Sequence, residues 1–117
     1  MKQFEVWDAD LLYSENSHVQ GGHRPVIVVS NNAANTYSPA VTIVPLTSRH
    51  SKSNLPTHVW IDVSGLPLRS LALCEQITTV DKDQLKKCIG FIADSPTRKR
   101  LGQAMLVQLG ITQAAAH

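Results

Sequence analysis

The sequence has few cysteines, few aromatic residues and no long hydrophobic run. Only Cys74 and Cys88 occur in 117 residues, which is too few for a disulfide scaffold, and both are expected to be free thiols buried as small hydrophobic residues. No apolar stretch approaches the ~20 residues that a membrane-spanning helix needs, and residues 1–5 lack the apolar region of a secretory signal. We therefore expect a cytoplasmic protein without membrane contact.

Spacings typical of metal sites are also missing. The five histidines show no HxxxH or HExxH motif and the cysteines form no CxxC pair, so no metal or other cofactor is expected. Aromatic side chains make up only 5% of the chain, which argues against a platform of rings that stacks RNA bases. The net charge of +2 is compatible with a phosphate-bearing partner if the positive side chains cluster.

The sequence does contain a series of strand patterns followed by one helix. Its length suits a single domain over residues 1–112, with a frayed tail at 113–117. Five or six strands are predicted, at residues 4–11, 25–29, 41–46, 57–62, 71–80 and 87–92. The strand at 71–80 is expected to bend near Glu75 and Gln76, and Pro45 indicates an edge or a bulge near the end of its strand.

The segments between the strands carry turn and cap signals. A long loop over Leu12–Gly22 and a glycine turn over 21–25 precede the second strand. A short helical turn follows, capped near Asn31 and ended by Ser38 and Pro39. The C-terminal helix is expected to start with Ser95 as N-cap and to end near Gly110. Its buried stripe is predicted to be Leu101, Ala104, Met105 and Leu109. This pattern favours a mainly β fold, a small and partly closed antiparallel barrel with a packed C-terminal helix.

Three stretches could carry chemistry. In "GGHRP" Arg24 is a permanent cation next to a rigid proline, which suits phosphate, although a surface ion pair explains it equally simply. In "TSRHSK" the hydroxyl of Thr47 is followed by Arg49 and Lys52, which would attract a polyanion unless the segment is a plain solvated loop. Glu75 and Gln76 could read base edges in single-stranded RNA, or form the polar face of a strand.

Four motifs in order, "QGGHRPVIVVSN", "SPAVTIVPLTS", "LPTHVWID" and "LALCEQITTVDKDQL", resemble the MazF/PemK-type toxins of bacterial toxin–antitoxin modules. The resemblance covers nearly the whole chain. It implies a small SH3-like barrel of the CcdB–PemK type with a C-terminal helix, and a homodimer. It also implies a metal-independent endoribonuclease that cuts single-stranded mRNA, and a cognate acidic antitoxin that blocks the RNA groove. In such enzymes the 2′-hydroxyl of the substrate attacks phosphorus, which leaves a 2′,3′-cyclic phosphate and a 5′-hydroxyl.

The resemblance also implies roles for individual residues. The family's catalytic arginine falls on Arg24 and its strand-end threonine on Thr47, which would stabilise and bind the scissile phosphate. The RNA-binding residues that the resemblance implies are Gln20, Asn31, Leu55, His58, Glu75 and Gln76. Lys52 of the basic loop is expected to bind RNA with them.

One stretch departs from the family pattern. Many relatives have Ser-Glu-Gln before the glycines, where this chain has His18, Val19 and Gln20. The change indicates a different cleavage preference, and either His18 or His23 could supply a titratable group beside Arg24. A CcdB-like gyrase poison, or an inactive protein that binds RNA or antitoxin, is the alternative function. The Arg24/Thr47 pair separates these alternatives, because only the nuclease needs it.

Overall fold

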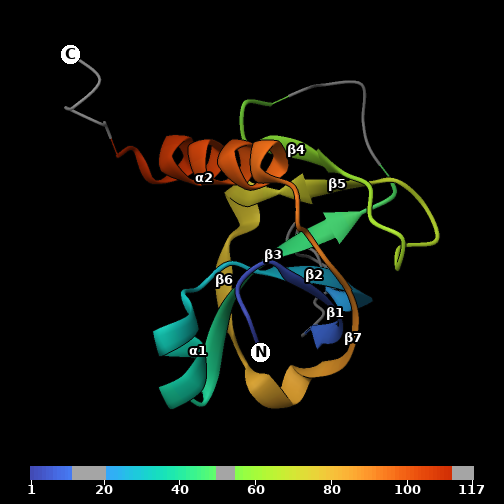
Figure 1. Cartoon of the computed structure of the whole chain (residues 1–117), viewed down its shortest axis with the longest axis vertical. Helices are drawn as coiled ribbons and strands as arrows, with labels where there is room; N and C mark the ends of the chain where they lie inside the picture. The colour runs from blue at the N-terminus through green and yellow to red at the C-terminus, as the bar shows by residue number, and fades with distance from the viewer. Residues whose placement is uncertain (12–20, 50–54, 112–117) are drawn as a thin grey trace.

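The computed structural model describes residues 1–11, 21–49 and 55–111, and within them seven strands and two helices follow one another (Figure 1). The elements are β1 (Glu5–Leu11), β2 (Gly22–Val28), α1 (Asn32–Tyr37), β3 (Ala40–Thr47), β4 (His58–Ile61), β5 (Ser70–Leu73), β6 (Thr78–Asp81), β7 (Leu85–Phe91) and α2 (Ser95–Leu109). The mainly β fold with a C-terminal helix is confirmed, with seven strands instead of five or six. The predicted tail, and most of the predicted loop before Gly22, lie outside the described residues.

The strands pair antiparallel in the order β4-β5-β3-β2-β1-β7, and β6 also pairs with β3. β5 and β6 replace the single strand predicted over 71–80, because a 3₁₀ turn at Cys74–Gln76 bends the chain where a bend was expected. The prediction of an edge or a bulge at Pro45 is wrong, since β3 is central and its register with β2 runs through Val26↔Pro45 without a shift. Its ladder with β6 ends at Ile43 and its ladder with β5 starts at Leu46, so Pro45 lies between them.

The sheet is open, with β4 and β7 at its two ends. The connection between β4 and β5 nevertheless lies directly on β7. A Cβ atom added to Gly65 would stand 1.4 Å from the carbonyl oxygen of Ile89, and one added to Gly90 would stand 3.2 Å from Cγ2 of Val63. Close packing of this connection, rather than a ladder of hydrogen bonds, therefore joins the two ends of the sheet.

Helix α2 lies beside β4 and the 3₁₀ turn and packs on the core (Figure 1). Leu101 and Ala104 are buried and Met105 packs against the same cluster, as predicted. Leu109 does not belong to the buried stripe: it is 57% exposed, because the last turns of α2 extend past the sheet. Among the described residues, no helix has the length and apolar character needed to cross a membrane.

Two further expectations near the C-terminus are wrong. Asp94, not Ser95, is the N-cap of α2: its carboxylate accepts a 2.9 Å hydrogen bond from the Thr97 N–H, and hydrogen bonds from Thr97 lower the pKa of Asp94. Cys88 is exposed because β7 is an edge strand. Cys74 is buried as expected, and desolvation raises the pKa of its thiol to about 12.

The contact at Gly65 predicts a large difference between two glycine substitutions. Gly65→Ala should lower the free energy of unfolding by about 3 kcal/mol or more, because backbone must move to admit the methyl group. Gly102→Ala is the matched control: a Cβ there meets nothing within 4 Å, and alanine in a helix should stabilise by about 0.5–1 kcal/mol. Urea unfolding of both variants checks this, and equal midpoints would contradict it.

Candidate active site

Arg24 lies on a paired strand and not, as predicted, in a turn. β2 begins at Gly22 and its register with β1 runs from Leu11↔Gly22 to Asp8↔Pro25, which sets Arg24 opposite Ala9. Gly22 has φ of +75°, a conformation that glycine adopts without strain. Gly22 thus allows the backbone conformation with which β2 begins. Pairing with β1 fixes the backbone of Arg24 on one side.

The other side of Arg24 faces the place where β2 and β3 stop pairing. Their register is Val28↔Ile43, Ile27↔Val44 and Val26↔Pro45, and the ladder ends there. Pro25 and Pro45 lack the N–H that a ladder needs at this point. Continuing the register by two residues places Arg24 across from Thr47. The two predicted catalytic residues therefore come from neighbouring strands at the mouth of one opening.

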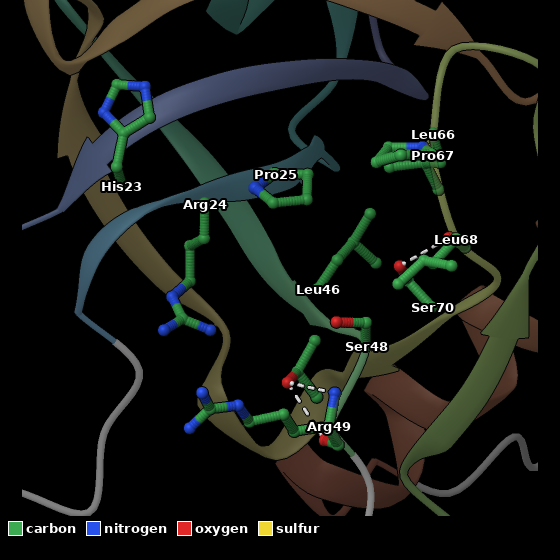
Figure 2. Close-up of a pocket in the computed structure, with 11 residues that line it drawn as sticks. His23, Arg24, Pro25, Leu46, Ser48, Arg49, Leu66, Pro67, Leu68 and Ser70 are labelled. Carbon is green, nitrogen blue, oxygen red and sulfur yellow. Dashed lines mark hydrogen bonds between the residues drawn. The ribbon is translucent and has the colours of Figure 1, made fainter.

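This opening is a pocket of about 530 Å³. It has a basic side and an apolar side (Figure 2). Residues around its basic side are His23, Arg24, Pro25, Thr47, Ser48 and Arg49, and Leu46, Leu66, Pro67, Leu68 and Ser70 complete the lining. Leu66, Pro67 and Leu68 are apolar, so they carried no chemical signal in the sequence and were missed. They reach the pocket because Gly65 lets their segment lie on β7.

The Arg24 side chain is half-buried and folds back along its own strand. Its Nε donates a 2.8 Å hydrogen bond to the carbonyl oxygen of Gly21, which directs the two terminal nitrogens toward the pocket. Desolvation, and then the charge of Arg49, lower the pKa of Arg24. Among the described residues, no carboxylate forms a salt bridge with Arg24, so the surface ion pair considered as an alternative is absent there.

Thr47 is buried at the end of β3, and its hydroxyl bonds to the backbone of Arg49, two residues later. Its hydroxyl donates to the Arg49 carbonyl oxygen at 3.0 Å and accepts from the Arg49 N–H at 3.1 Å. A hydroxyl has one proton to donate. To donate to a bound phosphate, Thr47 would have to release the carbonyl oxygen of Arg49.

His23 borders the pocket, but its imidazole leaves β2 on the opposite side from the Arg24 side chain. Figure 2 shows its imidazole and the Arg24 guanidinium pointing in opposite directions from the strand, as alternation along a strand requires. His23 is also exposed. His18, the other histidine considered as a helper, lies outside the described residues.

A second group of predicted residues lies where β4 meets the 3₁₀ turn. His58 Nε2 is 2.9 Å from Glu75 Oε2, and the Thr57 hydroxyl donates a 3.1 Å hydrogen bond to Glu75 Oε1. The His58 side chain is only 10% exposed, and its Nδ1 is buried without a partner in the described part of the chain. Nε2 is thus bonded to Glu75 and Nδ1 is buried, so the main effect of the contact between His58 and Glu75 is to join β4 to the 3₁₀ turn.

The other predicted RNA-binding residues are spread over the surface. Asn31 caps α1 by accepting a 2.8 Å hydrogen bond from the Ala34 N–H. It follows the far end of β2, on the order of 20 Å from Arg24 by strand rise. Leu55 is exposed before β4 and Gln76 ends the 3₁₀ turn. Gln20 and Lys52 lie outside the described residues. In the parts described, no group of three or more His, Cys, Asp or Glu residues could hold a metal ion.

Comparison with known proteins gives consistent matches over the whole chain. The sequence profile of the PemK-like, MazF-like toxins of type II toxin–antitoxin systems matches residues 2–105. The chain is 37% identical to the Endoribonuclease MazF of Staphylococcus saprophyticus, over 100% of this chain and 98% of that protein.

Solved structures match as well. An endoribonuclease from a mycobacterial species, in complex with its cognate antitoxin, has 28% identity and a TM-score of 0.78, over 97% of this chain and 98% of that one. MazF from Deinococcus radiodurans shares the fold, with 20% identity and a TM-score of 0.77 over 94% of this chain and 96% of that one.

The contacts of Glu75 predict a structural cost when its carboxylate is removed. Glu75→Ala should lower the free energy of unfolding by about 1–3 kcal/mol, because Thr57 and His58 lose their shared acceptor. Glu75→Gln retains one acceptor oxygen and should cost less. Chemical denaturation of the two variants measures this, and wild-type stability of Glu75→Ala would show that the contact does not hold β4.

Proposed function

The chain belongs to the PemK-like, MazF-like toxin family of type II toxin–antitoxin systems, and from this premise we propose that it is an endoribonuclease that cleaves single-stranded mRNA in the cytoplasm. The observation that carries the proposal is the meeting of Arg24 and Thr47 in one pocket at the open end of β2 and β3. A full-length relative named as an endoribonuclease supports the same activity. Cleavage of mRNA would stop translation and growth.

The proposed reaction is a transesterification within the RNA. The substrate 2′-hydroxyl loses its proton as its oxygen bonds to phosphorus, and the bond from phosphorus to the 5′-oxygen breaks as that oxygen takes up a proton. The products are a 2′,3′-cyclic phosphate and a 5′-hydroxyl end. Between them lies a pentacoordinate phosphorane with a second negative charge, which the enzyme must stabilise. We propose that protein cations meet this charge without a metal.

Arg24 is the group proposed to stabilise the phosphorane. Its guanidinium is a planar fork that suits two phosphoryl oxygens, and its Nε bond to Gly21 keeps the terminal nitrogens directed toward the pocket. Partial burial strengthens its interaction with an entering charge. An arginine is a poor proton acceptor, because its ordinary pKa exceeds about 12, so its electrostatic role is the principal one. Thr47 would bind the scissile phosphate through its hydroxyl.

The RNA groove is proposed to extend well beyond this pocket. Leu55, His58, Glu75 and Gln76 would line it on the β4 side, and Gln20, Asn31 and Lys52 would complete it. Because Asn31 follows the far end of β2, one chain does not bring Asn31 to the pocket that holds Arg24 and Thr47. A groove shared by two chains would do so, which agrees with a homodimer. The half-exposed apolar side chains of Val107, Leu109 and Ile111 favour burial against a second copy.

The partner that restrains the enzyme is proposed to be an acidic antitoxin. A structural relative was solved with its cognate antitoxin. The guanidinium groups in the pocket of this chain would attract a segment rich in carboxylates, which would compete with RNA. A gyrase-poisoning toxin of the CcdB type is less well supported, since the curated relative is named as an endoribonuclease.

The test is cleavage of a long RNA by the purified protein in EDTA, with sequencing of the 5′-hydroxyl ends. Arg24→Ala should lower the cleavage rate by about 10²- to 10³-fold, the usual loss when one group that stabilises transition-state charge is removed. Lys87→Gln is the control, because it removes an exposed cation on β7 outside the pocket. If the wild-type protein leaves the RNA intact and arrests gyrase, the proposed nuclease function is wrong.

The position of His23 predicts that it takes no part in proton transfer. His23→Ala should retain the wild-type dependence of kcat on pH, because the imidazole is exposed and points away from Arg24. The same measurement on His18→Ala tests the other histidine. A shifted pH profile in His23→Ala would show that substrate binding brings this side chain to the reacting atoms.

A further inference from the structure

The pocket contains a second arginine that the proposed mechanism has not used. Arg49 follows β3 and lies on the same side of the pocket as Arg24, and Figure 2 shows the two guanidinium groups facing one another. They are close enough for the charge of Arg49 to lower the pKa of Arg24. Two like charges are thus held near each other at the mouth of one opening.

Nothing in the described part of the chain neutralises these two charges. The described salt bridges include neither arginine, and the pocket lining contains no Asp or Glu. Like charges repel, so such an arrangement is unfavourable until an anion lies between them. A site of this kind fits a ligand with two negative charges, or one charge spread over several oxygens.

The backbone of Arg49 is fixed although its side chain is exposed. Both of its backbone polar groups bond to the Thr47 hydroxyl, at 3.0 and 3.1 Å, and Thr47 is buried at the end of a central strand. The position from which the side chain extends is therefore set by β3. Substitution of the Arg49 side chain leaves these backbone hydrogen bonds in place, so the variants should fold.

We propose that Arg49 is a second phosphate-binding residue of the active site, and that its guanidinium and that of Arg24 together clamp the scissile phosphate. The inference rests on the proposed nuclease function and deepens it. Arg24 holds the phosphate from β2 and Arg49 from the end of β3, so the two cations approach the equatorial oxygens from neighbouring strands. Thr47 then positions Arg49 through the bond that it accepts from the Arg49 N–H, and it binds the phosphate once its own proton turns away from the Arg49 carbonyl oxygen.

The clamp should matter more for catalysis than for binding. A phosphodiester carries one negative charge and the phosphorane carries two, so a second cation stabilises the transition state more than the bound substrate. Loss of Arg49 should therefore lower the rate of the chemical step and leave substrate affinity nearly unchanged. The effect should be smaller than for Arg24, because Arg49 is exposed and water and salt screen its charge.

The experiment compares Arg49→Ala, Arg49→Gln and Arg49→Lys with Lys87→Gln, which removes an equal charge outside the pocket. Single-turnover cleavage is measured on an oligoribonucleotide that carries the mapped cleavage sequence. Affinity is measured on the same oligonucleotide with a 2′-deoxyribose at the attacking position, which binds but cannot react. Arg49→Ala and Arg49→Gln should cleave about 10- to 100-fold more slowly and bind within about threefold of wild type. Arg49→Lys should recover most of the rate because it retains the charge.

A second readout is independent of RNA cleavage. Inorganic phosphate is titrated at pH 8, where it is mainly a dianion, and binding is followed by the thermal stability of each variant. Arg24→Ala and Arg49→Ala should both weaken the stabilisation by phosphate, and Lys87→Gln should leave it unchanged. If the wild type binds phosphate through both arginines but cuts no RNA, the proposed function fails and the two arginines remain a phosphate-binding site. If Arg49→Ala matches Lys87→Gln in cleavage or matches wild type in phosphate binding, the clamp is wrong.

Discussion

The end of the ladder between β2 and β3 is the constraint on which the rest of the site depends. Hydrogen bonding stops at Val26 and Pro45, and beyond that point the two strands present Arg24 and Thr47 to each other across a pocket instead of across a ladder. The strands remain firm, because β1 pairs with β2 as far as Gly22 and β5 pairs with β3 at Leu46 and Thr47. An opening with rigid sides suits charge stabilisation, since the cations need not reorganise during the reaction.

The far wall of this opening comes from the long connection between β4 and β5. Leu66, Pro67 and Leu68 reach the pocket because the neighbouring Gly65 lies against the backbone of β7. The contact at Gly65 joins the two ends of an open sheet and also places an apolar surface opposite the arginines. Stability and site geometry therefore depend on the same close approach of two backbone segments.

Much of the fold was predictable from local sequence, whereas the site depended on long-range pairing. Runs of Val and Ile marked the central strands, and the polar pair at Glu75 marked the bend. Family resemblance pointed to Arg24 and Thr47, but their meeting follows from a register that no local pattern reveals. Cys88 and Leu109 were misjudged because tertiary packing decides which face of an edge strand is open and where a helix leaves the core. Leu66, Pro67 and Leu68 were missed because apolar loop residues carry no chemical signature.

The charges of Arg24 and Arg49, which no carboxylate of the described residues neutralises, also bear on the stability of the fold. The lowered pKa of Arg24 means that the folded chain holds this proton less tightly than the unfolded chain, so its charge reduces folding stability at any pH below that pKa. An anion that settles between the arginines relieves the repulsion and stabilises the fold by mass action. A carboxylate-rich inhibitor that binds between the arginines would thus block the pocket and stabilise the fold through the same contact.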